Sequence, residues 1–139
     1  MPSLQESVTV NAPADKVWEA VVDFEGRPKY SSRVKEAKLL DGAPLREGSR
    51  IRLVVDRNAF TPVVQGIQPK ERLTLLVKGP GFNATHEYRL AAQGGAVQVT
   101  IAARYGGLMG GVFGGLMKGS FQRDLVDELA AIKKAAEGV

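Results

Sequence analysis

Three ring-bearing polar residues near the middle of the chain have the side chains best suited to chemistry. His86 is the only histidine, and imidazole is the one side chain whose ordinary pKa lies near neutrality. Tyr88 follows it by two positions, and Tyr105 lies further along the chain. A neutral imidazole can hydrogen-bond a ligand carbonyl or act as an acid or base, and phenols add hydrogen-bond donors. These three residues form a candidate site if one face of a sheet carries them all.

The segments that hold these residues, 82–90 and 96–105, alternate in a way that predicts two strands, and a hairpin turn is signalled by Gln93-Gly94-Gly95 between them. A period of two places His86, Tyr88 and Tyr105 on the apolar faces of these strands. By the same count Glu87 and Arg104 lie on the opposite faces, and we exclude them from the site. Two alternatives to a ligand-binding role stay open. The histidine could form its hydrogen bonds with a neighbouring strand or with solvent, and the tyrosines could only pack in the core.

Other catalytic and cofactor-binding patterns are missing from the sequence. There is no cysteine, so thiolate chemistry and disulfides are excluded, and a single histidine argues against a zinc site. Neither Gly-x-Ser-x-Gly nor a phosphate-binding glycine motif occurs. The spacing of Asp23, Asp56 and Asp124 signals no metal or carboxylate pair, and we interpret them as surface residues. We therefore expect no cofactor and no metal.

A glycine-rich repeat at 106–121, GGLMGGVFGGLMKGSF, precedes the end of the chain. In a helix its residues four apart would share one face and form a single apolar ridge of Met109, Phe113, Met117 and Phe121. Seven glycines, each costing about 1 kcal/mol relative to alanine, oppose a helix formed by local propensity. We expect a loop over roughly 106–111 and a helix that begins between 112 and 116. As a loop, the repeat could gate a ligand cavity.

The remaining elements follow from hydrophobic periodicity. A strand at 4–10 is followed by an amphipathic helix at 14–24, with Trp18 as a core anchor, and by a short second helix or turn at 27–33. Besides 82–90 and 96–105, further strands are predicted at 34–40, 49–56, 60–67 and 72–78. Pro62 indicates an edge, a bulge or a late strand start in one of them. The stripe of Phe121, Leu125, Leu129, Ile132 and Ala136 predicts a final helix over 120–137.

Length and charge restrict the class of protein. The 139 residues suit a single domain, 1–139, and their net charge is +4. Basic residues are densest at Arg27, Lys29, Arg33, Lys35 and Lys38, which we interpret as a solvated surface, with no nucleic-acid motif around them. No signal peptide is apparent, and the longest nearly uncharged stretch, 105–117, is too short to span a bilayer. We expect a cytoplasmic protein with no integral membrane segment.

The opening SVTVNAPADKVWEAVVDFEGRPKY resembles the START/Bet v 1-like (SRPBCC) superfamily, especially its bacterial polyketide cyclase/dehydrase-like and lipid-transport-like members. The strand at 35–40, the Gly-Ser-Arg-Ile-Arg segment at 48–52 and the final helix support this, while Tyr30 stands where many relatives have tryptophan. The resemblance implies an α+β helix-grip fold. In it a curved antiparallel sheet of six or seven strands wraps around a long C-terminal helix, with two short helices after the first strand and an apolar cavity beneath the last helix.

Three functions are compatible with these observations. The first is binding or transport of a hydrophobic small molecule, such as a lipid, isoprenoid or polyketide-like compound. Its cavity would be lined by His86, Tyr88, Tyr105, Met109, Phe113, Met117 and Phe121. The second is a polyketide cyclase or dehydratase that uses the same cavity, with His86 as the candidate catalytic residue. The third is an interaction module whose apolar glycine-rich segment docks a partner or a second copy of the chain as a homodimer.

Overall fold

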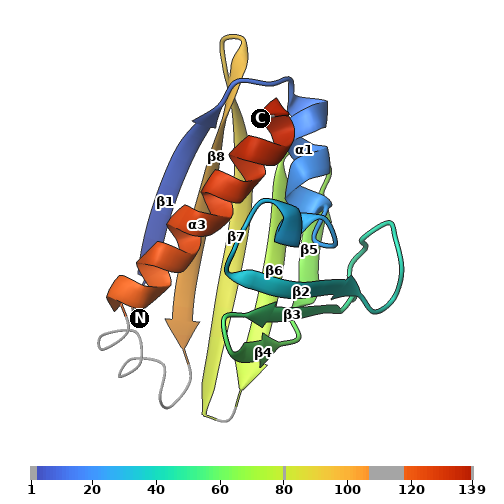
Figure 1. The fold of residues 1–139 in the computed structure, drawn as a ribbon, viewed down its shortest axis with the longest axis vertical. Helices are drawn as coiled ribbons and strands as arrows, with labels where there is room; N and C mark the ends of the chain where they lie inside the picture. Colours follow the sequence, from blue (N-terminus) through green and yellow to red (C-terminus); the bar gives the residue numbers. More distant parts are fainter. Residues whose placement is uncertain (1–2, 80, 107–117, 139) are drawn as a thin grey trace.

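The computed structural model describes residues 3–79, 81–106 and 118–138. Within these ranges the chain forms two antiparallel sheets, one of five strands in the order β1-β8-β7-β6-β5 and one of three strands in the order β2-β3-β4. Figure 1 shows the last helix running diagonally across the large sheet, with the small sheet beside it.

The strands of the large sheet are β1 (Ser3–Val10), β5 (Val63–Gln68), β6 (Arg72–Gly79), β7 (Phe82–Gln93) and β8 (Ala96–Gly106). Those of the small sheet are β2 (Val34–Leu39), β3 (Ile51–Val55) and β4 (Asn58–Phe60). The helical elements are α1 (Ala14–Val22), a single turn of 3-10 helix η1 (Arg27–Lys29) and α3 (Lys118–Glu137).

The β7–β8 hairpin is the longest paired element and confirms the predicted alternation. Gln93 pairs with Ala96, so the turn consists of two glycines, and Gly94 adopts a φ of 62°. That left-handed conformation is the one that tight hairpin turns require and that glycine adopts without strain. Along β8 the alternate residues Val97, Val99, Ile101, Ala103 and Tyr105 are buried. The inward face of the hairpin is therefore the one that the period of two predicts.

The prediction of a single sheet of six or seven strands is wrong, because the chain changes sheets at Pro62. Strand β4, which the sequence did not predict, pairs only with β3, and β5 begins at Val63 and pairs with β6. Pro62 lacks an N–H group and cannot continue a hydrogen-bonded ladder. Three backbone hydrogen bonds, Ile51 N–H to Pro62 O, Val64 N–H to Ser49 O and Gly48 N–H to Val64 O, still link the two sheets there. The late strand start was one of the predicted alternatives.

Helix α1 is two residues shorter than predicted. Asp23 leaves helical geometry, with φ −82° and ψ 70°, and its carboxylate accepts a hydrogen bond from Gly26 N–H at 3.1 Å. This short turn redirects the chain, and Phe24 is buried just beyond the helix end. Trp18 packs partly buried against the core, as expected of an anchor.

Helix α3 confirms the predicted C-terminal helix. Leu125, Leu129 and Ile132 are buried beneath it, and Lys133 Nζ donates a hydrogen bond to Thr9 O of β1 at 2.7 Å. Gly138, at φ 71°, ends the helix by donating its N–H to Lys134 O. The predicted helix start between 112 and 116 lies outside the described residues. Of the predicted loop over 106–111 only Gly106 is described, and it is the last residue of β8.

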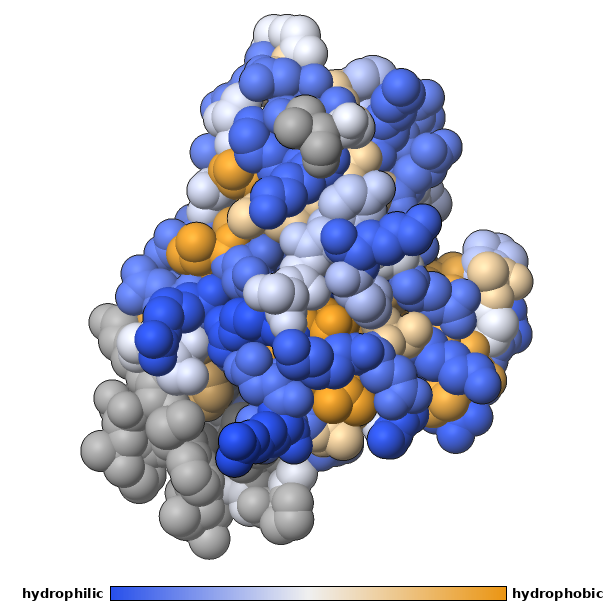
Figure 2. Space-filling view, in the orientation of Figure 1, coloured by the Kyte–Doolittle hydropathy of each residue, from blue (hydrophilic) through white to orange (hydrophobic). Residues whose placement is uncertain are grey.

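Most of the described residues visible in Figure 2 are hydrophilic. On the face shown in Figure 2, hydrophobic residues gather in small separate patches, several of them over the region of the small sheet. The exposed large apolar side chains in the described ranges are Leu40, Phe60 and Val126. No helix in these ranges combines the length and apolar character that crossing a bilayer would need.

The burial pattern of α3 yields a test of the packing. Ile132→Ala removes a fully buried side chain and should lower the free energy of unfolding by about 2–5 kcal/mol. Val126→Ala, on the exposed side of the same helix, should change it by no more than about 0.5 kcal/mol. Urea denaturation measures both. Equal effects of the two substitutions would contradict the placement of this helix on the sheet.

Candidate functional site

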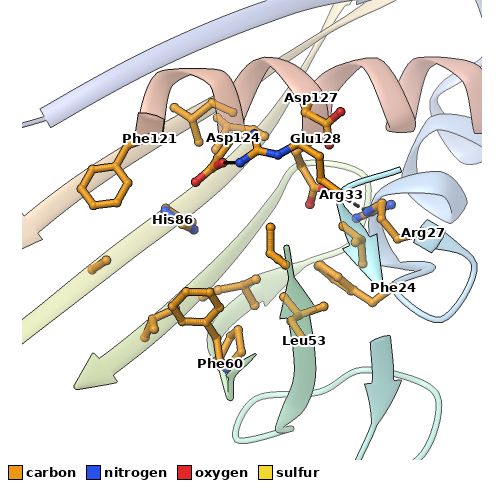
Figure 3. Close-up of a pocket in the computed structure, with 18 of the residues that line it drawn as sticks. Phe24, Arg27, Arg33, Leu53, Phe60, His86, Phe121, Asp124, Asp127 and Glu128 are labelled. Carbon is orange, nitrogen blue, oxygen red and sulfur yellow. Dashed lines mark ion pairs between the residues drawn. The ribbon is translucent and has the colours of Figure 1, made fainter. Parts of the chain in front are cut away.

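A cavity of about 160 Å³ lies between the large sheet, the small sheet and α3. Figure 3 shows side chains from all three entering it. Its apolar lining comprises Phe24, Val34, Leu53, Val55, Phe60, Pro62, Leu75, Val77, Ala84, Ile101, Phe121 and Leu125. Its polar lining comprises Arg27, Arg33, His86, Tyr88, Tyr105, Asp124, Asp127 and Glu128. The cavity is therefore apolar on most sides and polar beneath α3.

The sheet side of the cavity is formed by residues from three paired rows across β6, β7 and β8. The middle row joins Leu75, His86 and Ala103, and the flanking rows are Val77–Ala84–Tyr105 and Leu73–Tyr88–Ile101. Directly paired residues in neighbouring strands place their side chains side by side on one face. Because Ala84 in this lining is small, it leaves space beside the imidazole.

One edge of the cavity is closed by an aromatic pair. The rings of Tyr105 at the end of β8 and Phe121 in the first turns of α3 are stacked, with centroids 4.6 Å apart and planes at 16°. Offset stacking of this kind adds about 0.5–1.5 kcal/mol to the burial of the rings. The pair therefore fixes the start of the described helix to the last strand. Tyr105 is buried in this wall.

Arg27 reaches the polar wall because the chain reverses sharply after α1. A Cβ atom added at Gly26 would lie 2.2 Å from a carboxylate oxygen of Asp23, so a larger residue would displace the carboxylate that accepts the hydrogen bond of this turn. The turn sends the Arg27 side chain back under the end of α1. There its Nη1 and Nη2 atoms donate to Ala20 O at 2.6 Å and Val21 O at 2.8 Å. A cation at the carbonyl end of a helix is also favoured by the helix dipole.

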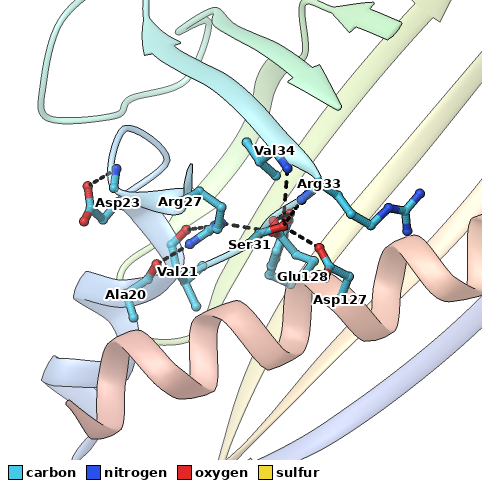
Figure 4. Close-up of polar contacts among 11 residues, drawn as sticks. Ala20, Val21, Asp23, Arg27, Ser31, Arg33, Val34, Asp127 and Glu128 are labelled. Carbon is cyan, nitrogen blue, oxygen red and sulfur yellow. Dashed lines mark hydrogen bonds and ion pairs between the residues drawn. The ribbon is translucent and has the colours of Figure 1, made fainter. Parts of the chain in front are cut away.

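The same guanidinium forms a buried ion pair with α3. Arg27 Nε lies 2.9 Å from Glu128 Oε1, and the arginine side chain is only 2% exposed. Its Cζ atom also lies 4.6 Å above the ring of Phe24, within cation–π range. Tyr88 donates its hydroxyl proton to Glu128 Oε2 at 2.6 Å. Figure 4 shows the contacts of Arg27 with Ala20, Val21 and Glu128 between α1 and α3.

A second ion pair crosses the cavity nearer to solvent. Arg33 donates from Nε and Nη2 to Asp56 Oδ2, at 3.2 and 2.9 Å, and its Nη2 lies 2.5 Å from Asp124 Oδ1. Asp56 follows β3 of the small sheet, whereas Asp124 belongs to α3. Beside them, Ser31 Oγ donates to Asp127 Oδ2 at 2.5 Å. These contacts tie the segment that precedes β2 to the C-terminal helix.

Burial shifts the protonation of the groups that face the cavity. Loss of hydration lowers the pKa of His86 below its ordinary value, although the charge of Glu128 opposes this. Burial raises the pKa of Tyr105 to about 12, with Asp124 adding to the shift. Burial likewise raises the pKa of Asp124, against the attraction of Arg33. The imidazole and both phenols are thus held in their neutral forms at neutral pH.

The structure gathers four of the seven predicted site residues around the cavity: His86, Tyr88, Tyr105 and Phe121. Within the described ranges, neither the imidazole nor the Tyr105 hydroxyl has a hydrogen-bonding partner. Tyr88 does have one, Glu128. Met109, Phe113 and Met117 lie outside the described residues, together with the glycine repeat that could form a gate. The binding role of all seven residues stays a prediction.

The sequence reasoning missed the charged wall. Arg27 and Arg33 were assigned to a solvated basic surface, yet Arg27 is buried and Arg33 lines the cavity. Asp124 was assigned to the surface and also lines the cavity. Glu128 did carry a signal, since it lies three residues after Leu125 and four before Ile132, within the apolar stripe of α3. A carboxylate on such a face needs a buried partner.

The described residues offer no group of three histidine or acidic side chains that could hold a metal ion. The candidate site is therefore an apolar cavity with a neutral imidazole and phenol available for hydrogen bonding, beside a wall of ion pairs.

Comparisons with known proteins agree with this geometry. Residues 1–137 match the family model described as polyketide cyclase/dehydrase and lipid transport. Among solved structures, the Zhui aromatase/cyclase from Streptomyces sp. R1128 superposes with a TM-score of 0.81 at 20% identity, covering 97% of this chain and 93% of that one. A START superfamily protein from Mycobacterium smegmatis gives 0.73 at 18% identity, covering 98% and 97%. Ara h 8.0201 gives 0.79 at 14% identity, covering 99% and 98%. Among curated proteins no relative is found.

The buried ion pair predicts an asymmetric response to substitution. Arg27→Met should lower the free energy of unfolding by about 3–5 kcal/mol, because Glu128 stays buried without its cation. The double variant Arg27→Met, Glu128→Leu should regain part of the lost free energy of unfolding. Arg52→Met provides the control, since its exposed pair with Glu36 is worth only about 0–1 kcal/mol. Urea denaturation distinguishes these cases, and equal effects at positions 27 and 52 would refute the buried role.

The single histidine permits a direct pH test. Proton NMR of the imidazole should give a titration midpoint below about 6.5, the value for an exposed histidine. As the pH falls, His86 takes up a proton in the unfolded chain before it does so in the folded protein. The free energy of unfolding should therefore fall as pH drops below about 6.5. His86→Gln should make that fall shallower. A midpoint at or above the ordinary value would show that the imidazole is not desolvated.

Proposed function

Because the chain belongs to the polyketide cyclase/dehydrase and lipid transport family, within the START/Bet v 1-like superfamily that its sequence resembles, we propose that it binds a hydrophobic small molecule between its sheets and α3. Family membership supports hydrophobic-ligand binding or polyketide cyclisation and does not choose between them. The observation that carries the binding function is the cavity itself, whose lining is largely apolar. Lipids, isoprenoids and polyketide-like compounds share the required apolar body.

The size of the cavity supports a compact ligand portion. An apolar cavity of about 150 Å³ is large enough to take up benzene. The cavity of about 160 Å³ therefore has room for one ring or a short branched chain. Its polar groups with free hydrogen-bonding capacity are few, as is typical of ligand sites in which a small number of groups fix the orientation. Tyr105 and His86 would supply them.

A polyketide cyclase is the second candidate, and the placement of His86 favours it. A neutral imidazole at the cavity wall can accept or donate a proton to a substrate held beside it. The fold shared with the Zhui aromatase/cyclase is compatible with such a reaction. If His86→Ala leaves the turnover of a converted substrate intact, this assignment fails. The third function, docking of a partner or a second copy, depends on the glycine-rich segment outside the described residues.

The cavity can be filled to test binding. Ala84 lines it and is 3% exposed, whereas Ala91 on the same strand is exposed. Ala84→Phe should place a ring in the cavity and reduce ligand occupancy by about tenfold or more, since an added ring removes most of the free volume. Native mass spectrometry of the protein purified from its own host measures the co-purifying small molecule and its occupancy.

Ala91→Phe is the matched control and should retain full occupancy. Circular dichroism establishes that both variants are folded. Equal occupancy in folded Ala84→Phe and wild-type protein would rule out this cavity as the binding site. The cytoplasmic location and the lack of nucleic-acid binding stay predictions from the sequence.

A further inference from the structure

The charged side chains around the cavity differ in how far protein partners already neutralise them. Two arginines and three acidic residues line it, so the ionised side chains sum to one excess negative charge: Arg27, Arg33, Asp124, Asp127 and Glu128. Among the side chains that the structure describes, this lining includes no lysine. Whether a charged ligand can bind depends on how far each arginine is already committed to protein partners.

The charge of Arg27 is already compensated by a buried protein partner. Its terminal nitrogens donate to two backbone carbonyls of α1, and its Nε faces Glu128 at 2.9 Å. At 2% exposure the guanidinium is enclosed by these partners. Binding a ligand carboxylate here would require breaking the pair with Glu128, which would leave that carboxylate buried and unpaired.

Arg33 is neutralised twice. It donates two hydrogen bonds to Asp56 and lies 2.5 Å from Asp124. A ligand carboxylate that approached its remaining nitrogen would meet the negative field of both aspartates. It would also lose its own hydration on entering an apolar cavity, a large cost unless a cation compensates it.

The groups that remain available are uncharged. In the described part of the chain, the His86 imidazole and the Tyr105 hydroxyl have no hydrogen-bonding partner, and burial keeps both neutral. The imidazole offers one donor and one acceptor, and the phenol offers the same. A ligand hydroxyl or carbonyl can satisfy these groups without introducing a charge. The acidic side chains on α3 lie nearby in the same cavity (Figure 3).

We infer that the cavity selects uncharged ligands, with a compact apolar body and a hydroxyl or carbonyl group, and rejects carboxylates of the same shape. The inference rests on the proposed binding function. It makes Asp124 a specificity-determining residue, because among the described residues this carboxylate is the one in the cavity lining that pairs with Arg33, the less enclosed of the two lining arginines. Removing the charge of Asp124 would leave Arg33 paired with Asp56 alone, so its positive charge would no longer be opposed from within the cavity.

A matched pair of single-ring probes tests the inference. Calorimetric titration at pH 7 should give a Kd for 4-propylphenol at least about tenfold below that for 4-propylbenzoate. Asp124→Asn should narrow this ratio by about fivefold or more, mainly through tighter benzoate binding beside Arg33, which would then be paired with Asp56 alone. Glu47→Gln removes the same charge at an exposed loop position outside the cavity lining and should leave the ratio unchanged.

The outcomes separate the inference from the function that it deepens. Equal or tighter binding of the benzoate overturns the inference while ligand binding stands. A preference for the phenol that Asp124→Asn leaves unchanged also overturns it, because general desolvation of the anion would then suffice. If neither probe binds the folded protein, both the inference and the proposed binding function are refuted.

Discussion

The buried pair of Arg27 and Glu128 is the constraint on which the arrangement of the other elements depends. The Arg27 guanidinium is only 2% exposed, so protein groups must replace the water that would otherwise solvate its charge. These groups are the carbonyls at the end of α1, the ring of Phe24 and the Glu128 carboxylate of α3. Glu128 in turn accepts the hydroxyl proton of Tyr88. Helix, turn and sheet are thereby fixed to one another at a point beside the cavity.

This arrangement explains why the cavity has one polar wall. Three acidic side chains of α3 line the cavity together with Arg27 and Arg33, and mainly apolar side chains from both sheets form the other sides. The small side chain of Ala84 leaves space on the sheet side of the cavity. A second tie, from Arg33 to Asp56 and Asp124, holds the small sheet near the helix. The hollow is thus bounded by contacts that also stabilise the fold.

Local patterns in the sequence predicted the parts of the fold that local rules determine. Alternation placed His86 and Tyr105 on the inner face, and the glycine pair at 94–95 predicted the hairpin. The division into two sheets depends on hydrogen bonds near Pro62 between segments that are separate in the sequence. The hydrophobic periodicity of a single segment carries no information about such bonds. Arg27 and Glu128 are far apart in the sequence, so neither residue alone indicates a partner. Only the carboxylate within the apolar stripe of α3 hinted at one.

The ion pairs of Arg27 and Arg33 attach α3 to the rest of the protein and also determine how the cavity responds to an anionic ligand. A substitution that changes one of these effects changes the other. Each arginine that might have bound an anionic ligand is instead used to join α3 to another element, Arg27 to α1 and Arg33 to the small sheet. A cavity that accepted carboxylates would need one of these cations released, and the released aspartate or glutamate would lose its partner in a partly buried setting. Selectivity against anions and the attachment of the helix thus have one physical origin. What the cavity offers instead is the neutral hydrogen-bonding capacity of His86 and Tyr105.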